Sequence, residues 1–385
     1  MDREKFRADV LTSFDANASV TEELLAYNQN VFQHDGIPKP IELPLTSEAF
    51  IADWQEYAEE AKVKGAFSVL KDVFVQWQFP IQEGISQTEA YRSATLKGID
   101  PLAVDRDLVL QQPEALHLII HQSMAGQIPV LLVKHRADFV TVVRSLVKRN
   151  EPVSIPASMG ACIVSGYNNW ARIRSYKQQW QQQNSHSDEA WDAEFKRLIA
   201  RKELYQDRFL ILSNEFYSNI EPEKLGLTAA QWRDLSFKIR LEHECNHYFT
   251  YRLFKSMRNN LLDELIADYM GIVAATGHYQ ADWFLHFMGL EAFPRYRQSG
   301  RLQNYRGEPP LSDSAFQILQ RLVYAAALNL ERFDLMYAQS SSLFDRSSIA
   351  FCLTYLTIEE LASSNAGDRI SEVLADLPQN LSLAS

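Results

Sequence analysis

The chain is poor in cysteine and in basic residues. Its 385 residues include three cysteines, and 38 Lys and Arg stand against 49 Asp and Glu, for a formal net charge of −11. Because Cys162, Cys245 and Cys352 are odd in number and widely spaced, we expect no disulfide framework and a reducing, cytoplasmic setting. The acidic balance, with no run of Lys or Arg, argues against a nucleic-acid partner.

Long apolar runs are also missing. No uncharged stretch reaches the roughly 18 apolar residues that could span a membrane. The N-terminus, Met1–Arg7, runs directly into charged residues and lacks the apolar core of a secretory signal. Glycine-rich phosphate loops are absent too, since the sequences around Gly160 and Gly166 lack the further glycines and the lysine of such a loop. We therefore expect no membrane partner, and nothing supports a nucleotide-driven function.

What is present is the composition of a folded protein, with 46% apolar and 23% charged residues. The apolar pattern predicts an α+β fold that is mainly helical. Residues 1–125 read as largely helical, a helix is expected at 137–148, and strands are expected at 128–133 and 209–217. Composition places a boundary near 180–205. We predict a mainly helical N-terminal region with a few short strands, and a metal-binding domain with C-terminal helices, over residues 1–200 and 201–385 respectively.

The second half begins with a well-marked helix. Thr228 and Gln231 have the spacing of a capping box, so a helix should begin there and run to about Lys255. Two apolar stripes along it predict burial on more than one side. A second helix is expected over Asp263–Ala275, with Gly277 as its C-terminal cap.

The first of these helices carries an H-E-x-x-H motif, His243-Glu244-Cys245-Asn246-His247. Histidines four apart lie about 40° from each other around a helix, so both can direct a ring nitrogen at one zinc ion. The second helix carries Glu264 and Asp268, which could supply a third ligand and a supporting carboxylate. The donor types predict a zinc site with one open position for water.

Residues 240–270 resemble the gluzincin metallopeptidases, in which a glutamate from a second helix joins the zinc held by H-E-x-x-H. The resemblance implies His243, His247 and Glu264 as zinc ligands, Glu244 as the general base, and Asp268 as the carboxylate that orients His243. It also implies a zincin-like core of a small sheet and the metal helix, flanked by helical regions. The chain departs from the family in carrying Asp263 where an asparagine often precedes the ligand glutamate.

The function predicted is zinc-dependent hydrolysis of a peptide bond in a peptide or protein substrate. In this mechanism Glu244 takes the proton of the attacking water while zinc polarises the carbonyl oxygen. A non-peptide amide substrate stays open, as does a catalytically silent zincin that binds a metal or a partner. A di-iron carboxylate bundle is a further alternative, because Glu114 and His117 also form E-x-x-H and His121 pairs with His117 at helical spacing.

Other residues carry weaker signals. A group that stabilises the developing oxyanion is expected downstream, and the sequence does not choose among His278, Tyr279, His286, Arg295 and Tyr296. Cys245 should face away from the metal and serve as a small core residue. The strand before the metal helix could receive a substrate by β-addition or could be a plain core strand.

Overall fold

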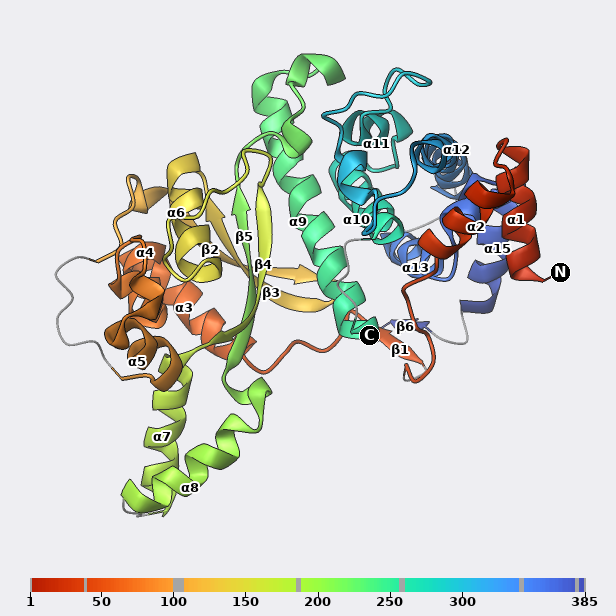
Figure 1. Cartoon of the computed structure of the whole chain (residues 1–385). Helices are drawn as coiled ribbons and strands as arrows, with labels where there is room; N and C mark the ends of the chain where they lie inside the picture. Colours follow the sequence, from red (N-terminus) through yellow and green to blue (C-terminus); the bar gives the residue numbers. More distant parts are fainter. Residues whose placement is uncertain are drawn as a thin grey trace. The chain divides into compact units, whose positions relative to one another are not determined.

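The computed structural model describes residues 2–37, 40–99, 107–184, 188–255, 260–338, 343–377 and 381–383. The protein is mainly helical and has one small four-stranded mixed sheet (Figure 1), so the predicted α+β class is confirmed. Backbone contacts divide the chain into two units. Unit 1 combines Met1–Leu45 with Phe216–Ser385, and unit 2 is Thr46–Glu215. No helix in the described ranges is long and apolar enough to cross a membrane.

The sheet belongs to unit 2 and has the order β2-β3-β5-β4. β5 is parallel to β3 and antiparallel to β4, while β2 and β3 are antiparallel. The side chains of Phe209, Leu210, Ile211 and Leu212 are all fully buried, which is the pattern of a strand covered on both faces. β5 is therefore a core strand of this sheet, the second of the two roles that its sequence left open. The strand bounds are β2 (Leu116–Ser123), β3 (Gly126–Val133), β4 (Ala161–Asn168) and β5 (Gln206–Ser213).

Six α-helices complete the described part of unit 2. α3 and α4 contact β2, and α6 contacts β3, β4 and β5. The main core is aromatic: Trp54, Phe74 and Phe209 meet with ring centroids 5.1 to 6.0 Å apart. The helix bounds are α3 (Ile51–Lys64), α4 (Ala66–Val73), α5 (Glu89–Lys97), α6 (Arg136–Val147), α7 (Trp170–Asn184) and α8 (Asp188–Ile199).

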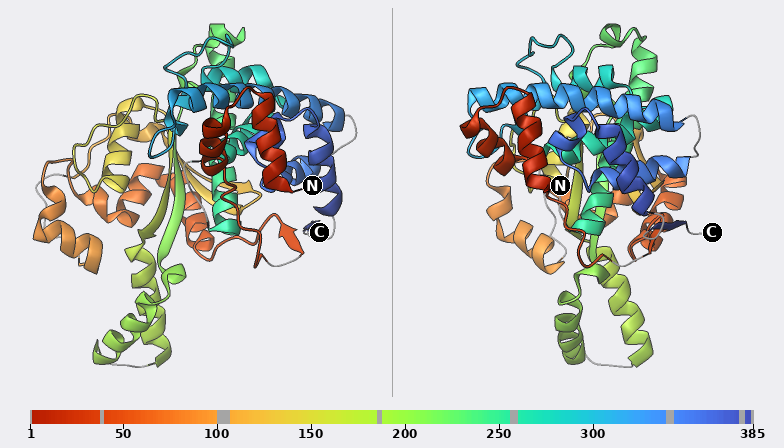
Figure 2. Two further views of the ribbon diagram at one scale, coloured as in Figure 1. Left: turned by 45° about the vertical axis from the view of Figure 1, so that its right-hand side comes forward. Right: turned by 90° about the vertical axis from the view of Figure 1, so that its right-hand side faces the viewer.

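The described residues of unit 1 form helices and one short parallel strand pair, β1 and β6. Its two chain segments pack together, and Figure 2 shows the first two helices beside the C-terminal ones. A buried ion pair joins the segments, since Arg7 of α1 lies 3.2 Å from Glu359 of α14. The element bounds are α1 (Arg3–Ser13), α2 (Ala18–Tyr27), β1 (Ile41–Leu43), α9 (Ala229–Phe254), α10 (Leu261–Thr276), α11 (Ala281–Met288), α12 (Asp313–Ala338), α13 (Leu343–Leu353), α14 (Ile358–Ala362), α15 (Ala366–Asp376) and β6 (Leu381–Leu383).

The division into units differs from the predicted one at 200/201. Unit 2 extends to residue 215 instead of ending at 200. The first 45 residues belong to unit 1, together with the C-terminal helices. The expectation that 1–125 is largely helical is wrong for 116–123, which form β2. Composition does not reveal this arrangement, because the Arg7–Glu359 contact joins positions far apart in the sequence.

Candidate metal centre

The candidate centre is built on α9 and α10, which lie side by side in unit 1 (Figure 1). α9 begins at the predicted capping box, in which Thr228 and Gln231 satisfy each other's backbone N–H groups. α10 starts after Asn260, whose side chain accepts a hydrogen bond from the Leu262 N–H, and it ends at the predicted Gly277 in the left-handed conformation. These three helix ends thus follow from local sequence.

A glycine allows the two helices to approach closely. A Cβ atom on Gly271 of α10 would lie 2.6 Å from the backbone oxygen of Ile239 of α9 and 3.0 Å from its Cγ2. Ile239 is one helical turn before His243, and Gly271 is just beyond Asp268. The close contact therefore fixes the separation of the two helices next to the polar residues that they share.

The three predicted ligands converge there. His243 and His247 point their Nε2 atoms at each other across 3.0 Å. The Glu264 carboxylate faces both, with Oε2 at 3.6 Å from His243 Nε2 and Oε1 at 3.5 Å from His247 Nε2. Donors bonded to one tetrahedral zinc at ~2.0–2.1 Å lie ~3.3–3.4 Å apart. The three separations scatter around that value, so the donor set fits a single ion without rearrangement of the helices.

Two carboxylates fix the orientation of the imidazole rings. Asp268 Oδ1 lies 2.9 Å from His243 Nδ1, and Asp263 Oδ2 lies 3.0 Å from His247 Nδ1. A carboxylate can only accept, so each Nδ1 carries the proton and each Nε2 presents a lone pair. Asp268 therefore takes the position predicted for it. The role of Asp263 was not predicted: it does for His247 what Asp268 does for His243.

Further groups hold the two carboxylates. The Tyr217 hydroxyl donates to Asp268 Oδ1 at 2.6 Å, and an Arg301 guanidinium N–H donates to Asp268 Oδ2. Arg301 also donates to the Tyr217 oxygen at 2.9 Å and lies 3.9 Å from Glu264 Oε2. Asp263 Oδ1 accepts from Thr250 at 3.2 Å. The orientation of the candidate ligands is thus supported by a connected network of buried and partly buried polar groups.

Arg301 and Tyr305 come from one short 3-10 helix, η7 (Arg301–Tyr305). Gly300, the residue before η7, lies against the backbone of Met288 and Gly289. A Cβ on Gly300 would lie 2.5 Å from Gly289 Cα and 2.3 Å from the Met288 oxygen. The backbone of this segment therefore packs directly against the end of α11. Burial, and in addition the charge of Glu264 and a hydrogen bond to it, raise the pKa of Tyr305 above its ordinary value. The neutral hydroxyl is a donor held beside the third ligand.

Electrostatics favour a cation among the three ligands. Burial alone would lower the pKa of His247, but Asp263 and Glu264 raise it well above the ordinary value. Burial would raise the pKa of Glu264, yet His247, His243 and Arg301 hold it well below the usual range. Three acceptors that meet at one point require a proton or a metal ion. With neutral histidines, three ionised carboxylates and Arg301 leave two negative charges, which one divalent ion balances.

Glu244 is partly exposed on α9. No hydrogen bond or ion pair joins its carboxylate to another residue of the described chain. On a helix its direction lies about 60° from that of His247 and about 100° from that of His243. It is the acidic group on α9 that stays available for a proton transfer beside the ligands.

The sequence leaves five downstream residues as candidates for oxyanion stabilisation. Within the described ranges none of them forms a hydrogen bond or ion pair with His243, His247 or Glu264, and Tyr279 is buried with its backbone N–H donated to Asp334. Those candidates are His278, Tyr279, His286, Arg295 and Tyr296. No sequence pattern marks Arg301 and Tyr305, which are four residues apart in a stretch rich in Pro, Gly and Arg.

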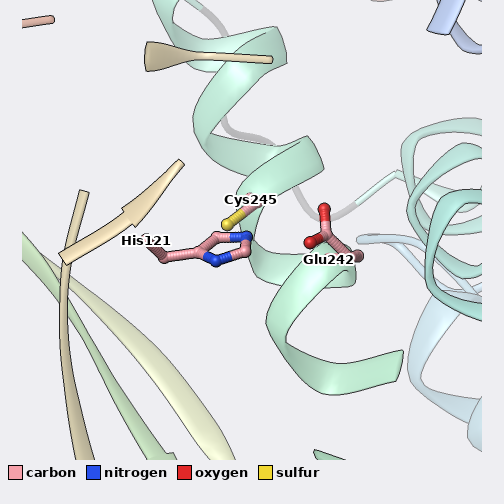
Figure 3. Close-up of side chains that lie close together, drawn as sticks. All are labelled: His121, Glu242 and Cys245. Carbon is pink, nitrogen blue, oxygen red and sulfur yellow. The ribbon is translucent and has the colours of Figure 1, made fainter. Parts of the chain in front are cut away.

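Two other expectations concern cysteine and the di-iron alternative. Cys245 is a buried residue of α9, and Figure 3 shows it projecting from this helix, as Glu242 does.

His117 and His121 lie on β2, not on a helix, so four residues separate them by about 13 Å of strand. The helical E-x-x-H that a di-iron bundle needs at Glu114 and His117 is therefore not formed.

Substituting Gly271 with alanine tests the helix contact. Because the new Cβ would meet the Ile239 oxygen, the helices must move apart, and we expect the free energy of unfolding to fall by ~1–3 kcal/mol. Metal affinity should fall with it. Gly367 of α15 is the matched control, since its added Cβ would meet nothing within 4 Å. Urea unfolding of both variants measures the difference; equal stabilities would contradict the contact.

Comparison with known proteins gives a family without an assigned activity. No curated protein and no solved structure matches the chain significantly. A family model matches residues 9–365, which include both helices of the candidate centre. The chain belongs to this family, which is described as a family of unknown function (DUF7005).

Proposed function

We propose that the protein is a zinc-dependent hydrolase whose ligands are His243, His247 and Glu264. One observation carries the proposal: both Nδ1 protons are held by carboxylates, so two Nε2 lone pairs and a carboxylate meet within 3.0 to 3.6 Å. Neutral imidazole nitrogen and carboxylate oxygen are the donors that zinc takes in catalytic sites with three protein ligands. Zinc bound there supplies a Lewis acid and a water of lowered pKa.

The residues of the chain have separate roles in the proposed reaction. Glu244 accepts the proton of the attacking water and passes it to the leaving group. Asp268 and Asp263 hold the imidazole rings so that Nε2 faces the ion. Tyr305 offers a hydroxyl beside Glu264, and Arg301 holds Asp268 and approaches Glu264. We infer that one of these two donors, rather than the five residues considered first, contacts the developing oxyanion.

We propose a peptide bond as the substrate because the H-E-x-x-H motif, followed by Glu264 and Asp268, resembles that of the gluzincins. A zincin-like arrangement and a cytoplasmic setting are proposed on the same sequence grounds. A non-peptide amide would use the same groups, so substrate screening has to include both kinds of bond. A metal-loaded protein that hydrolyses neither would be a silent member of this class.

Metal content is the first test. Purified wild type should hold close to one zinc per chain by inductively coupled plasma mass spectrometry, and His247→Ala and Glu264→Ala should hold far less, since each removes a third of the protein donors. His286→Ala is the matched control, because His286 contacts the backbone of its own helix at Asp282 and no ligand. Zinc uptake should also release protons and weaken at low pH, since the raised pKa of His247 makes the proton a competitor.

Three results would contradict the proposal. Equal zinc in wild type and in both ligand variants would place the ion elsewhere. Two irons per chain would point to a different centre. If the protein holds no metal after reconstitution with zinc, the three acceptors bind a proton and no metal ion.

A further inference from the structure

Unit 2 contains a pocket that takes no part in the candidate metal centre. Its volume is about 590 Å³. One wall is α5, a second is the end of α6 with the turn that follows it, and a third is β4 from Val164 to Asn168. All of the residues that line it belong to unit 2. A pocket of this size is sufficient for a small metabolite.

The charge of the pocket is opposite to that of the protein. Arg92 and Arg149 line it, and no acidic residue does so among the described residues. The chain as a whole carries a net charge of −11. Neither guanidinium forms an ion pair or hydrogen bond within the described ranges. Two unneutralised guanidiniums at one opening attract an anion and can bind its oxygens in pairs.

The nearest acid in sequence is already engaged. Both oxygens of Glu151 accept hydrogen bonds from backbone N–H groups, from Gly84 at 2.9 Å and from Ser86 at 3.0 Å. A hydrogen bond from the Ser86 side chain, together with those two backbone bonds, lowers the pKa of Glu151 below its ordinary value. Glu151 therefore fixes the loop that carries Ser86, a lining residue, instead of pairing with Arg149.

The backbone that presents Arg149 is held in an unfavourable conformation. Arg149 and Asn150 have φ angles of 54° and 61°, in the left-handed region that residues with a Cβ avoid. Asn150 is fully buried, and its amide donates to the backbone oxygens of Gln76 and Phe79 at 2.9 Å each, while its oxygen accepts from Tyr91 at 3.2 Å. These bonds keep the turn in place. Non-glycine residues in such conformations cluster at functional sites.

The opposite wall shows a second local distortion. β4 has a bulge between Ser165 and Tyr167, and Gly166 within it has a φ of 75°. Bulges often lie beside binding sites, where they redirect the strand. Gln76, which also lines the pocket, has a buried Oε1 atom that accepts no hydrogen bond from any described residue. Such an atom is left unsatisfied until a donor reaches it.

We propose that this pocket binds a small organic anion. Its carboxylate or phosphate group pairs with Arg92 and Arg149, an N–H or O–H group donates to Gln76, and an apolar body lies against Leu96, Leu146 and Val147. The ligand class follows from the lining: two cations, one unpaired acceptor and an aliphatic wall. The site is independent of the metal centre and of the hydrolase activity proposed for it.

Isothermal titration calorimetry at constant ionic strength tests the site. The probes are phenyl phosphate, phenylacetate, inorganic phosphate and neutral benzyl alcohol. We expect phenyl phosphate or phenylacetate to bind better than both inorganic phosphate, which lacks the apolar body, and benzyl alcohol, which lacks the charge. The stronger of the two anions identifies the headgroup. Arg92→Gln/Arg149→Gln should weaken binding about tenfold or more, because it removes two charge-assisted contacts.

The matched control is Arg201→Gln, an exposed arginine of unit 2 outside the pocket, which should bind as wild type does. Circular dichroism and thermal unfolding establish that the double variant is folded. If it is not, Gln76→Leu serves in its place and should lose affinity for a hydroxyl-bearing anion, mandelate, relative to phenylacetate. Three results would overturn the proposal: no binding of either aromatic anion, equal affinity in the folded double variant, or an equal loss in Arg201→Gln.

Discussion

Glu244→Gln is expected to lower turnover by ~10²–10⁴-fold while zinc content stays at one ion per chain. Glutamine keeps the size of the side chain but cannot take a proton at neutral pH. Because no ion pair or hydrogen bond within the described residues engages Glu244, its replacement removes no contact that holds the fold. The loss should therefore appear in kcat, with little change in KM or in the melting temperature.

The assay follows hydrolysis of a quenched-fluorescent peptide library and of simple amides. Asp234→Asn is the matched control, since Asp234 is an exposed acid on the same helix, α9. Wild-type turnover in Glu244→Gln, with zinc present, would show that another group takes the proton. Loss of turnover together with loss of zinc would mean that Glu244 contributes to metal binding instead.

The candidate ligands could be predicted from the sequence because they depend on local rules. A capping box at Thr228 and a glycine cap at Gly277 define the start of α9 and the end of α10, and helical periodicity places His243 beside His247. The donor type of Glu264 on the second helix and the resemblance both predict it as the third ligand, and the structure places it beside both histidines. These elements need little information from distant parts of the chain.

The rest depends on contacts between distant residues. Arg301 reaches Asp268 from the 3-10 helix η7, whose position depends on the Gly289–Gly300 backbone contact. No periodic pattern in the sequence marks such a contact. Tyr217 follows a strand as an ordinary aromatic residue, yet its hydroxyl lies between Asp268 and Arg301. The sequence of β2 is compatible with a helix because His117 and His121, four residues apart, would share one face of a helix and one face of a strand alike. Pairing with β3 makes this segment a strand.

Asp268→Ala is expected to be the most destabilising single substitution at the centre. Asp268 is fully buried and accepts from His243, Tyr217 and Arg301. Its removal leaves the partly buried Arg301 guanidinium with Glu264, at 3.9 Å, as its remaining counterion among the described residues. Breaking a buried pair by removing one partner costs ~3–5 kcal/mol, so the free energy of unfolding should fall by about that amount. Zinc affinity should fall about 10–100-fold, because His243 loses the group that orients it.

A double variant separates the two effects. Asp268→Leu/Arg301→Met replaces the buried pair with apolar side chains, so much of the lost stability should return. The His243 ring still lacks its carboxylate, so zinc affinity should stay about 10–100-fold below wild type. Urea unfolding of the metal-free proteins gives stability, and competition with a chromogenic chelator gives affinity. Tyr217→Phe serves as the control for the hydroxyl, which holds Asp268 but is not its counterion. If the double variant recovers stability and wild-type zinc affinity together, Asp268 is only the counterion of Arg301; if affinity alone stays low, its carboxylate positions His243 for the metal.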